Sequence, residues 1–288
     1  MPAERAELLP ITADDATAVA SFLHRNLNQK VPVGTWLTLL APPWPADAPN
    51  RGFQLVTPAG IVGAYVAVYS EREIRGETRR LCNLAAFCVL PDHRADGLRL
   101  IRALLRQPGF EFTDLSPSGN VVALDERLGF VHLDTATRIT PNLPAFGRRG
   151  VRVSSDPAVV AATLRGADAN TYRDHRDAPA SRHIVVVEGD AYAYLIVRRD
   201  RRKGLPLFAT PIHAGGDTEL LRRHWARVGA HLLGRHRLPL TLAEHRTLGF
   251  RPRLGVDQRT PRAKMFRSHE LEAADIDYLY SELTLLEW

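Results

Sequence analysis

The sequence predicts an α/β (α+β) protein with two tandem domains, each built on a mixed central sheet flanked by helices. Three observations support this prediction. The chain has 288 residues, which suits two domains of about 130 to 150 residues better than one. Short apolar strands alternate with amphipathic helical patterns in both halves. The second half also repeats the order of elements of the first, and Leu-Gly-Phe occurs in each, at residues 128–130 and 248–250.

The composition is that of a soluble globular protein. Hydrophobic residues make up 45% of the chain and charged residues 24%, which excludes a disordered chain. No apolar run approaches the ~20 residues that span a bilayer, and the first ten residues carry acids and a proline instead of a signal peptide. We therefore expect a cytoplasmic protein without a membrane partner. Cys82 and Cys88 lie too far apart on one predicted strand to form a disulfide, so we expect reduced thiols.

The net charge of +6 comes mainly from arginine, because only three of the 38 basic residues are lysines. Such an excess suits a nucleotide, a phosphorylated cofactor or RNA. A GC-rich genome produces the same bias, and we favour that interpretation because alanine and proline are also abundant. The densest basic run, residues 198–203, precedes Gly204 and is predicted to be a solvated hairpin tip.

The first half is predicted to form a domain around one buried strand. Residues 81–90 are nearly all apolar, which is typical of a central strand covered on both faces. The other predicted elements are a helix at 12–28, strands at 52–56 and 60–69, a charged hairpin tip at 71–80, a helix at 98–106, a strand at 110–115, a short helix at 119–128 and a strand at 130–137. The stretch 141–150 is rich in proline and glycine and is the predicted linker, which places the domains at residues 1–144 and 145–288.

The second half follows the same order. We predict a helix start at 156–165, strands at 184–188, 192–197 and 207–213, an amphipathic helix at 219–233, and a C-terminal helix within 275–288 that packs on the domain surface. Residues 211–217 correspond to the turn after the buried strand of the first half but lack its arginine and glycine spacing. Asp217 or Thr218 is predicted to cap the helix that follows.

The segment that carries chemistry runs from residue 88 to residue 100, where the buried strand turns directly into an amphipathic helix. The free N–H groups of a first helical turn, together with the helix dipole, favour an anion at such a turn. Gly97 allows a close approach of the backbone, and Arg94 adds a charge-assisted contact. Strand–turn–helix segments are common in α/β proteins, so this one alone is weak evidence for a cofactor site.

The residues around this turn carry a family resemblance. Val89-Leu90-Pro91, followed by Arg94-Ala95-Asp96-Gly97-Leu98-Arg99, resembles the Val-x-Pro strand end and the Arg/Gln-x-x-Gly-x-Gly/Ala pyrophosphate loop of the GNAT superfamily of acyl-CoA N-acyltransferases. The order of elements from about residue 10 to 137 is also similar. The resemblance implies that the CoA pyrophosphate binds Arg94 and the amides of Ala95, Asp96, Gly97, Leu98 and Arg99, and that the pantetheine arm pairs with the strand near Val89. Arg99 replaces the last small residue of the motif, and it either clashes with the phosphate or binds it.

Two positions that carry catalytic residues in that superfamily differ here. Asn83 stands where a glutamate base is frequent, and Asp125 stands where a tyrosine usually protonates the leaving thiolate. We expect Asn83 to orient the acceptor or a water and Asp125 to face the thioester, although an ionised aspartate is a poor acid near neutral pH unless burial raises its pKa. Trp36, Tyr172 and His175 are candidate acceptor-binding residues. The competing interpretation places Trp36 in the core and the other two in solvent.

These observations predict the direct transfer of an acyl group, most simply acetyl, from CoA to a small-molecule or peptide amine, with one CoA site in the first domain. The histidine and cysteine spacing predicts no metal site. No nucleophile elbow or Walker loop is present, which argues against a serine hydrolase and a P-loop NTPase. Two alternatives stay open. One is a Fem-type aminoacyl-tRNA-dependent transferase, the only case in which we expect a nucleic-acid partner. The other is a non-catalytic acyl-CoA-binding protein, which the loss of both usual acid–base residues favours.

Overall fold

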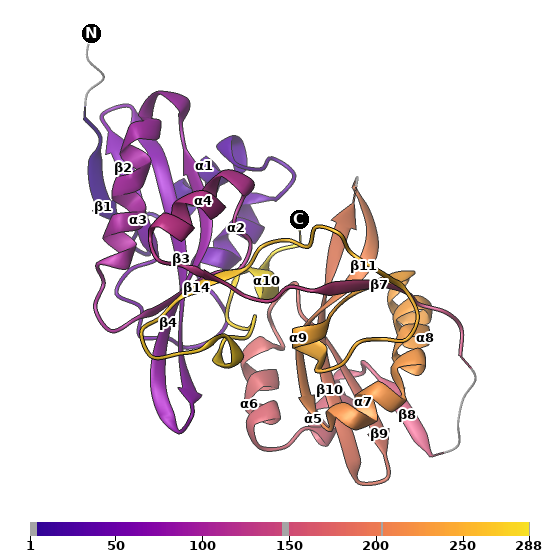
Figure 1. The fold of residues 1–288 in the computed structure, drawn as a ribbon. Helices are drawn as coiled ribbons and strands as arrows, with labels where there is room; N and C mark the ends of the chain where they lie inside the picture. Colours follow the sequence, from indigo (N-terminus) through magenta and orange to yellow (C-terminus); the bar gives the residue numbers. More distant parts are fainter. Residues whose placement is uncertain (1–4, 146–149, 203, 288) are drawn as a thin grey trace. The chain divides into compact units, whose positions relative to one another are not determined.

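The computed structural model describes the chain except for residues 1–4, 146–149, 203 and 288. Its contacts divide the chain into two compact units, which we describe separately (Figure 1). Unit 1 comprises Met1–Leu133, Ala263–Ile276 and Tyr280–Leu286, and unit 2 comprises Asp134–Arg262, Asp277–Leu279 and Glu287–Trp288. The predicted linker at 141–150 lies partly outside the described residues, and the domain boundary after residue 144 stays a prediction.

Unit 1 is built on a seven-stranded mixed sheet. Its order is β1 (Glu7–Pro10), β2 (Gly52–Thr57), β3 (Gly60–Ile74), β4 (Glu77–Val89), β5 (Glu111–Asp114), β14 (Met265–Arg267) and β6 (Val131–His132). The β4–β5 pair is parallel, and the other pairs are antiparallel. The helical elements are α1 (Ala16–Asn26), α2 (Val33–Leu40), the 3-10 helix η1 (Pro91–Asp96), α3 (Gly97–Leu105), α4 (Gly119–Arg127), the 3-10 helix η2 (Ala273–Asp275) and α10 (Glu282–Leu285).

Unit 2 repeats this plan strand for strand. Its sheet has the order β8 (Val151–Ser154), β9 (Arg182–Glu188), β10 (Ala191–Arg202), β11 (Leu205–Gly216), β12 (Leu240–Glu244), β7 (Thr137–Pro141) and β13 (Val256–Asp257). Here β11–β12 is the parallel pair. The helices are α5 (Pro157–Thr163), α6 (Gly166–His175), α7 (Thr218–Arg223), α8 (Trp225–His236) and α9 (His245–Leu248). The fold class predicted from the sequence, two mixed sheets flanked by helices, is therefore confirmed.

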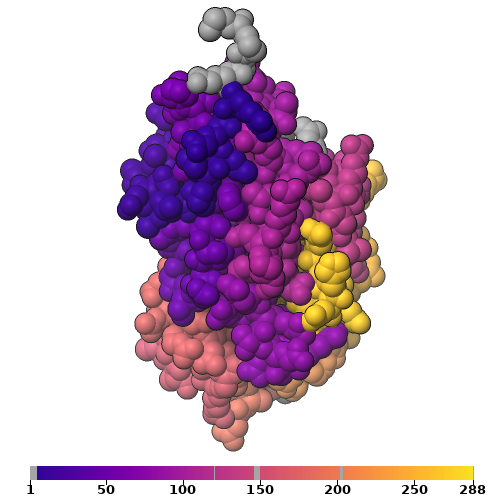
Figure 2. Space-filling model, turned by 90° about the vertical axis from the view of Figure 1, so that its left-hand side faces the viewer, coloured from indigo at the N-terminus to yellow at the C-terminus, as the bar shows by residue number. Residues whose placement is uncertain are grey.

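The two sheets exchange one strand. In unit 1 the strand between β5 and β6 is β14, which follows the whole of unit 2 in the chain. In unit 2 the corresponding place between β12 and β13 is taken by β7, which lies at the end of the first half of the sequence. Part of the returning C-terminal segment, in yellow, is visible beside the magenta surface of unit 1 in Figure 2. Each sheet is thus completed by a strand from the other half of the sequence.

A β-bulge lies at the same place in both sheets. The pairing of β3 with β4 skips Ala85, since Val66 pairs with Ala86 and Ala67 with Leu84. In unit 2 the pairing of β10 with β11 likewise skips Ile212. A bulge bends the strand that carries the extra residue and increases its twist, so β4 and β11 bend just beyond the point where their parallel partners stop.

Amphipathic α3 forms one side of the core of unit 1. Leu100, Ile101 and Leu104 are buried at helical spacing and pack with apolar side chains of the sheet. The predicted central strand is confirmed, because β4 is buried over most of its length. Cys82 and Cys88 both lie in β4, are buried and are free thiols, as expected.

Four sequence predictions need correction. Arg198 is not in a solvated tip but is 2% exposed within β10, where it faces Asp200 at 3.4 Å. The C-terminal helix is reduced to α10, because Tyr280 takes a φ of 55°, which a continuous helix cannot contain. The predicted strand at 130–137 is two strands that belong to different sheets, and the predicted helix at 219–233 breaks at His224 into α7 and α8.

Among the described residues, no helix combines the length and the apolar character needed to span a bilayer.

Candidate functional site

The candidate site begins where β4 and β5 part. Their parallel pairing covers three residue pairs and ends at Asn83 and Thr113, whereas β4 continues to Val89. The two strands carry their first buried polar side chains at this last pair, where the Thr113 hydroxyl donates a hydrogen bond to Asn83 Oδ1 at 2.9 Å. The bulge at Ala85 then turns β4 away. The geometry therefore makes a wedge with polar groups at its apex.

A carboxylate from the far end of the chain occupies this apex. Glu282, at the start of α10, is fully buried. Asn83 Nδ2 donates to one of its oxygens, and the Ser116 hydroxyl donates to the other at 2.6 Å. Asn83 thus orients an acidic side chain instead of standing alone on the strand. Sequence reasoning missed Glu282, because no local pattern links it to a strand 199 positions earlier.

Two further carboxyl groups are buried beside this pair. Asp114 ends β5 and is 4% exposed, and Asp125 lies on α4 with no exposed surface. The Tyr65 hydroxyl is 3.5 Å from Asp114 Oδ2, and the Ser116 N–H donates to Asp114 Oδ1 at 3.3 Å. Apart from its contact with the Asp114 carboxyl group, Asp125 has no side-chain hydrogen bond among the described residues. The site therefore concentrates three acids, Asp114, Asp125 and Glu282, with few compensating donors.

The surroundings of the two aspartates raise the pKa of both carboxyl groups. Burial raises the pKa of Asp114 well above its ordinary value, and the negative charges of Asp125 and Glu282 raise it further. Burial also raises the pKa of Asp125, to about 6, against a lowering effect of its contact with Asp114. Because two adjacent carboxyl groups repel each other when both are ionised, Asp114 and Asp125 titrate as a coupled pair.

The predicted pyrophosphate segment lies at the start of α3. Residues 91–96 form the 3-10 helix η1, and it runs directly into α3 at Gly97. The Gly97 N–H already donates to the Arg94 carbonyl. A Cβ at Gly97 would lie 3.0 Å from Phe87 Cζ and 3.5 Å from a Val89 methyl, so this glycine allows α3 to pack on β4. The Arg94 and Ala95 side chains are exposed, and Asp96 and Leu98 are partly buried.

Arg99 is held by the protein itself. One nitrogen of its guanidinium donates to the Ala6 carbonyl at 2.8 Å and to Asp96 Oδ1 at 2.9 Å. The arrangement keeps the Arg99 charge next to the Asp96 carboxylate. Arg94 is therefore the exposed cation best placed to meet a phosphate at this turn.

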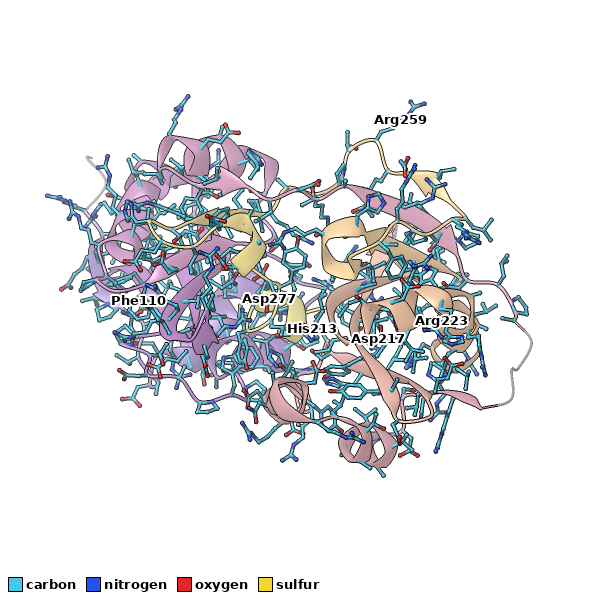
Figure 3. All side chains as sticks on the ribbon, turned by 60° about the horizontal axis from the view of Figure 1, so that its bottom comes forward. Phe110, His213, Asp217, Arg223, Arg259 and Asp277 are labelled. Atoms are coloured by element: carbon cyan, nitrogen blue, oxygen red, sulfur yellow. The ribbon has the colours of Figure 1, made fainter. Side chains whose placement is uncertain are left out.

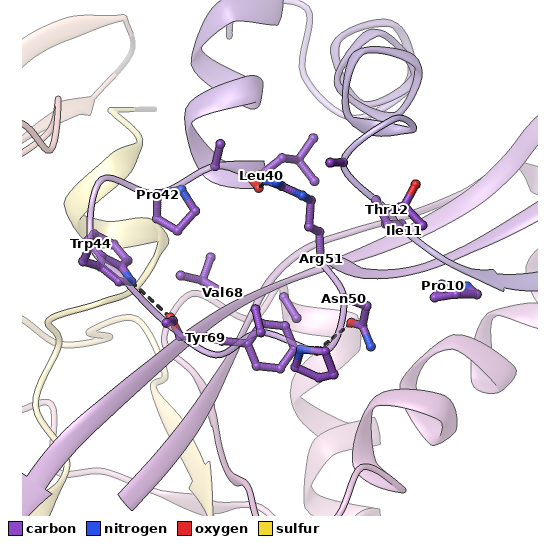
Figure 4. A pocket seen from close by; sticks show the side chains of 16 residues that line it. Pro10, Ile11, Thr12, Leu40, Pro42, Trp44, Asn50, Arg51, Val68 and Tyr69 are labelled. Atoms are coloured by element: carbon purple, nitrogen blue, oxygen red, sulfur yellow. Dashed lines mark hydrogen bonds between the residues drawn. The ribbon is translucent and has the colours of Figure 1, made fainter. Parts of the chain in front are cut away.

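A cavity of about 530 Å³ in unit 1 lies between α2, the loop after it and β3 (Figure 4). Trp44 lines it and donates its indole N–H to the Tyr69 carbonyl at 3.0 Å. The Tyr69 hydroxyl donates to Asn50 at 2.7 Å, and Arg51 donates to the Leu40 carbonyl. Trp36 does not line this cavity and is fully buried in α2. The polar groups of the cavity are thus engaged with one another.

The structure places the other two candidate acceptor residues on α6 in unit 2. His175 is fully buried, and its Nδ1 is 3.0 Å from the Thr171 carbonyl. The Tyr172 ring packs edge-on against His183 at a centroid distance of 4.9 Å and lines a separate cavity of about 520 Å³. No set of three or more His, Cys, Asp or Glu side chains in the described ranges is arranged to bind a metal ion.

Comparison with known proteins shows similarity at the level of structure. No protein-family model matches the sequence, and a search of curated proteins likewise found no match. A GCN5-related N-acetyltransferase from Anabaena variabilis aligns with a TM-score of 0.59 and 10% identity, covering 91% of this chain and 72% of its own. A probable N-acyltransferase from Enterococcus faecalis gives 0.59 and 11%, with coverages of 94% and 74%. A putative acetyltransferase from Pyrococcus horikoshii gives 0.51 and 12%, covering 96% of both chains.

The chain has the GNAT fold. These alignments span both units, so the fold similarity includes the second half as well as the segment that carries the motif. Within this fold, the end of β4 near Val89 and the turn at residues 91–97 are the two features that the sequence predicted to bind an acyl-CoA.

Proposed function

We propose that this protein is an acyl-CoA-dependent N-acyltransferase whose active site lies in unit 1. The observation that carries the proposal is the buried Glu282 carboxylate at the parting of β4 and β5, held by Asn83 and Ser116. It supplies a base at the place where the strand itself carries only an asparagine. Acetyl is the simplest acyl group for this site, and a small-molecule or peptide amine is the acceptor class.

Glu282 is the proposed general base. An attacking amine must lose a proton as its nitrogen bonds to the acyl carbon, and a carboxylate can accept that proton. Asn83 Nδ2 and the Ser116 hydroxyl each donate one hydrogen bond to Glu282, which fixes its orientation. Asn83 is then a positioning residue.

The Asp114–Asp125 pair is the proposed acid. When the C–S bond of a thioester breaks, the leaving thiolate needs a proton or another stabilising charge. Burial raises the pKa of both groups, so the pair retains a proton that an exposed aspartate would have lost. Asp125 lies on α4, the helix that the sequence predicted at residues 119–128, and we expect its side chain to face the thioester.

The residues of unit 1 fit an acyl-CoA at two places. The guanidinium of Arg94 is exposed at the start of a helix, where an anion is favoured, and β4 continues to Val89 beyond its pairing with β5. A bound acyl-CoA supplies the activated acyl group. Arg94 would hold its pyrophosphate, and the backbone near Val89 would pair with its amide-containing arm, while Gly97 contributes by packing.

Unit 2 differs at the corresponding turn. The Asp217 carboxylate there accepts hydrogen bonds from the N–H groups of Glu219 and Leu220, at 2.9 and 3.0 Å. A phosphate bound at this turn would need the same N–H donors, and the negative charge of Asp217 would repel the phosphate. We therefore assign a single acyl-CoA site, in unit 1.

The test separates binding from turnover. Acetyl-CoA binding is measured by calorimetry, and CoA release is measured with a thiol reagent over a panel of primary amines. Arg94→Ala is expected to weaken acetyl-CoA binding about 10-fold, because it removes one charge-assisted contact. Glu282→Gln is expected to leave binding unchanged and to slow CoA release by ~10² to 10⁴. The thiol assay has a low background, since Cys82 and Cys88 are buried.

Matched controls make the same chemical changes elsewhere in unit 1. Arg25→Ala and Glu73→Gln alter exposed side chains and should leave both readouts unaltered. If the wild-type protein fails to bind acetyl-CoA, the proposed donor is wrong, and salt-dependent tRNA binding would then support the aminoacyl-tRNA alternative. If acetyl-CoA binds but no amine releases CoA, the non-catalytic alternative gains support instead.

A further inference from the structure

A cavity of about 640 Å³ lies wholly within unit 2, at a place to which the proposed function gives no role. It is bounded by the end of β7, by α7 and α8, and by the segment that follows α9. Figure 3 labels Arg223, at the C-terminal end of α7, and Asp217, just before its first residue. The size is in the range of ligand-binding pockets, which is roughly 300 to 1,000 Å³.

The charge of the lining is one-sided. Among the described residues that line the cavity there are four arginines and no aspartate or glutamate; the four are Arg222, Arg223, Arg251 and Arg253. Three of them pair with carboxylates outside the lining, namely Glu219, Glu188 and Asp257. The arginine side chains in these pairs are 49 to 57% exposed. Pairs this exposed are worth about 0 to 1 kcal/mol, so an anionic ligand can exchange for them at little cost.

The same cavity exposes apolar surface. The rings of Trp225 and Phe250 meet edge-on with centroids 5.6 Å apart. Leu143 and Leu254 also line the cavity, and they are 52% and 63% exposed. When a ligand covers large apolar side chains that are this exposed around a concave site, the removal of apolar surface from water favours binding.

The side chain of Asn142, which lines the cavity, already has hydrogen-bond partners within the protein. Asn142 donates to the Leu238 carbonyl at 2.8 Å and accepts from the Thr241 hydroxyl at 2.9 Å. Gly229 makes room for it, because a Cβ there would lie 3.2 Å from Asn142 Oδ1. Asn142 therefore shapes the floor, and recognition is left to the arginines and the rings.

We propose that this cavity binds an organic polyphosphate that carries a planar ring, of the nucleoside diphosphate type. Several guanidinium forks suit a group with more than one negative charge, because each fork can bind two phosphate oxygens. A ligand with a single carboxylate would leave most of the arginines without a new partner. The ring of the ligand covers the apolar surface around Trp225 and Phe250. Arginine guanidinium planes also stack well on aromatic rings.

The test uses the full-length protein and ADP, with binding followed by calorimetry. Arg253→Glu changes an exposed residue, so the fold should persist, and we expect ADP affinity to fall 10-fold or more. Arg25→Glu makes the same change of charge on α1 and should leave ADP affinity unchanged. Arg94→Ala, measured in parallel, reports any ADP bound at the proposed pyrophosphate turn of unit 1, and Arg253→Glu should lower ADP affinity by the same factor in the Arg94→Ala background.

Three results would overturn the proposal. The first is that ADP binding survives Arg253→Glu but is lost in Arg94→Ala, which would assign it to unit 1. The second is that inorganic phosphate binds as tightly as ADP, which would show that the ring contributes nothing. The third is that laurate binds more tightly than ADP, which would make the cavity a site for acyl carboxylates.

Discussion

At the scale of single residues, the burial of Asp125 has a measurable consequence for stability. Its pKa is raised to about 6 in the folded state by burial, against about 3.9 in an unfolded chain. A raised pKa means that the protonated form favours folding, so this stabilisation is complete below pH 3.9 and is lost as the pH rises through 6. We expect Asp125 to lower the free energy of unfolding by about 2 to 3 kcal/mol between pH 4 and pH 8.

The variant Asp125→Asn keeps the side-chain volume and removes the titration. Its stability, measured by urea unfolding at several pH values, should depend less steeply on pH than that of the wild-type protein, and it should be the more stable protein at pH 8. Asp47→Asn, at an exposed site, serves as the control. Equal pH slopes for Asp125→Asn and the wild type would contradict this account of the buried acids.

At the scale of elements, the N-terminus of α7 shows how a capping residue both begins a helix and blocks an anion site. Asp217→Ala removes the acceptor for the N–H groups of Glu219 and Leu220 and should destabilise the protein by about 1 kcal/mol. Asp217→Asn keeps an acceptor and should cost much less. The free energy of unfolding from urea titration distinguishes the two variants, and equal losses would mean that the charge, not the hydrogen bonds, stabilises α7.

At the scale of the whole molecule, the exchange of β7 and β14 makes each sheet depend on both halves of the sequence. A chain cut after residue 144 contains β7 without its sheet and lacks β14 and Glu282. We expect it to show no cooperative thermal unfolding, because β5 and β6 lose the strand that lies between them. Circular dichroism during heating would measure this.

A redesigned chain provides the complementary measurement. The Leu133 N–H donates to the Lys264 carbonyl at 2.8 Å, so a short linker can join residues 1–133 directly to residues 263–286. This chain restores β14 and Glu282 to unit 1 and should unfold cooperatively. Cooperative unfolding of the 1–144 chain would instead show that the exchanged strand is dispensable.

Much of the fold was predictable because its signals are local. The nearly continuous apolar run of β4, the helical spacing of α3 and the glycine after α4 each report on a few neighbouring residues. Gly129 and Gly249 both take a positive φ at the end of a helix, in keeping with the repeated Leu-Gly-Phe that predicted a duplicated unit. The residues around 217 likewise predicted a cap at Asp217 or Thr218, and the structure shows that it is Asp217.

The sequence by itself determined the fold class and the duplication, since periodicity, turn residues and caps act within a few positions. The anion site at the turn before α3 stays a prediction. Only the tertiary structure decided which strand completes each sheet and which acid reaches Asn83. Glu282 lies in a segment whose helical spacing suggested a surface helix, yet its carboxylate is buried. The physical reason is that a carboxylate can be buried only where hydrogen-bond donors such as Asn83 and Ser116 contact it. These donors are distant from Glu282 in the sequence, so the residues next to Glu282 do not predict its burial.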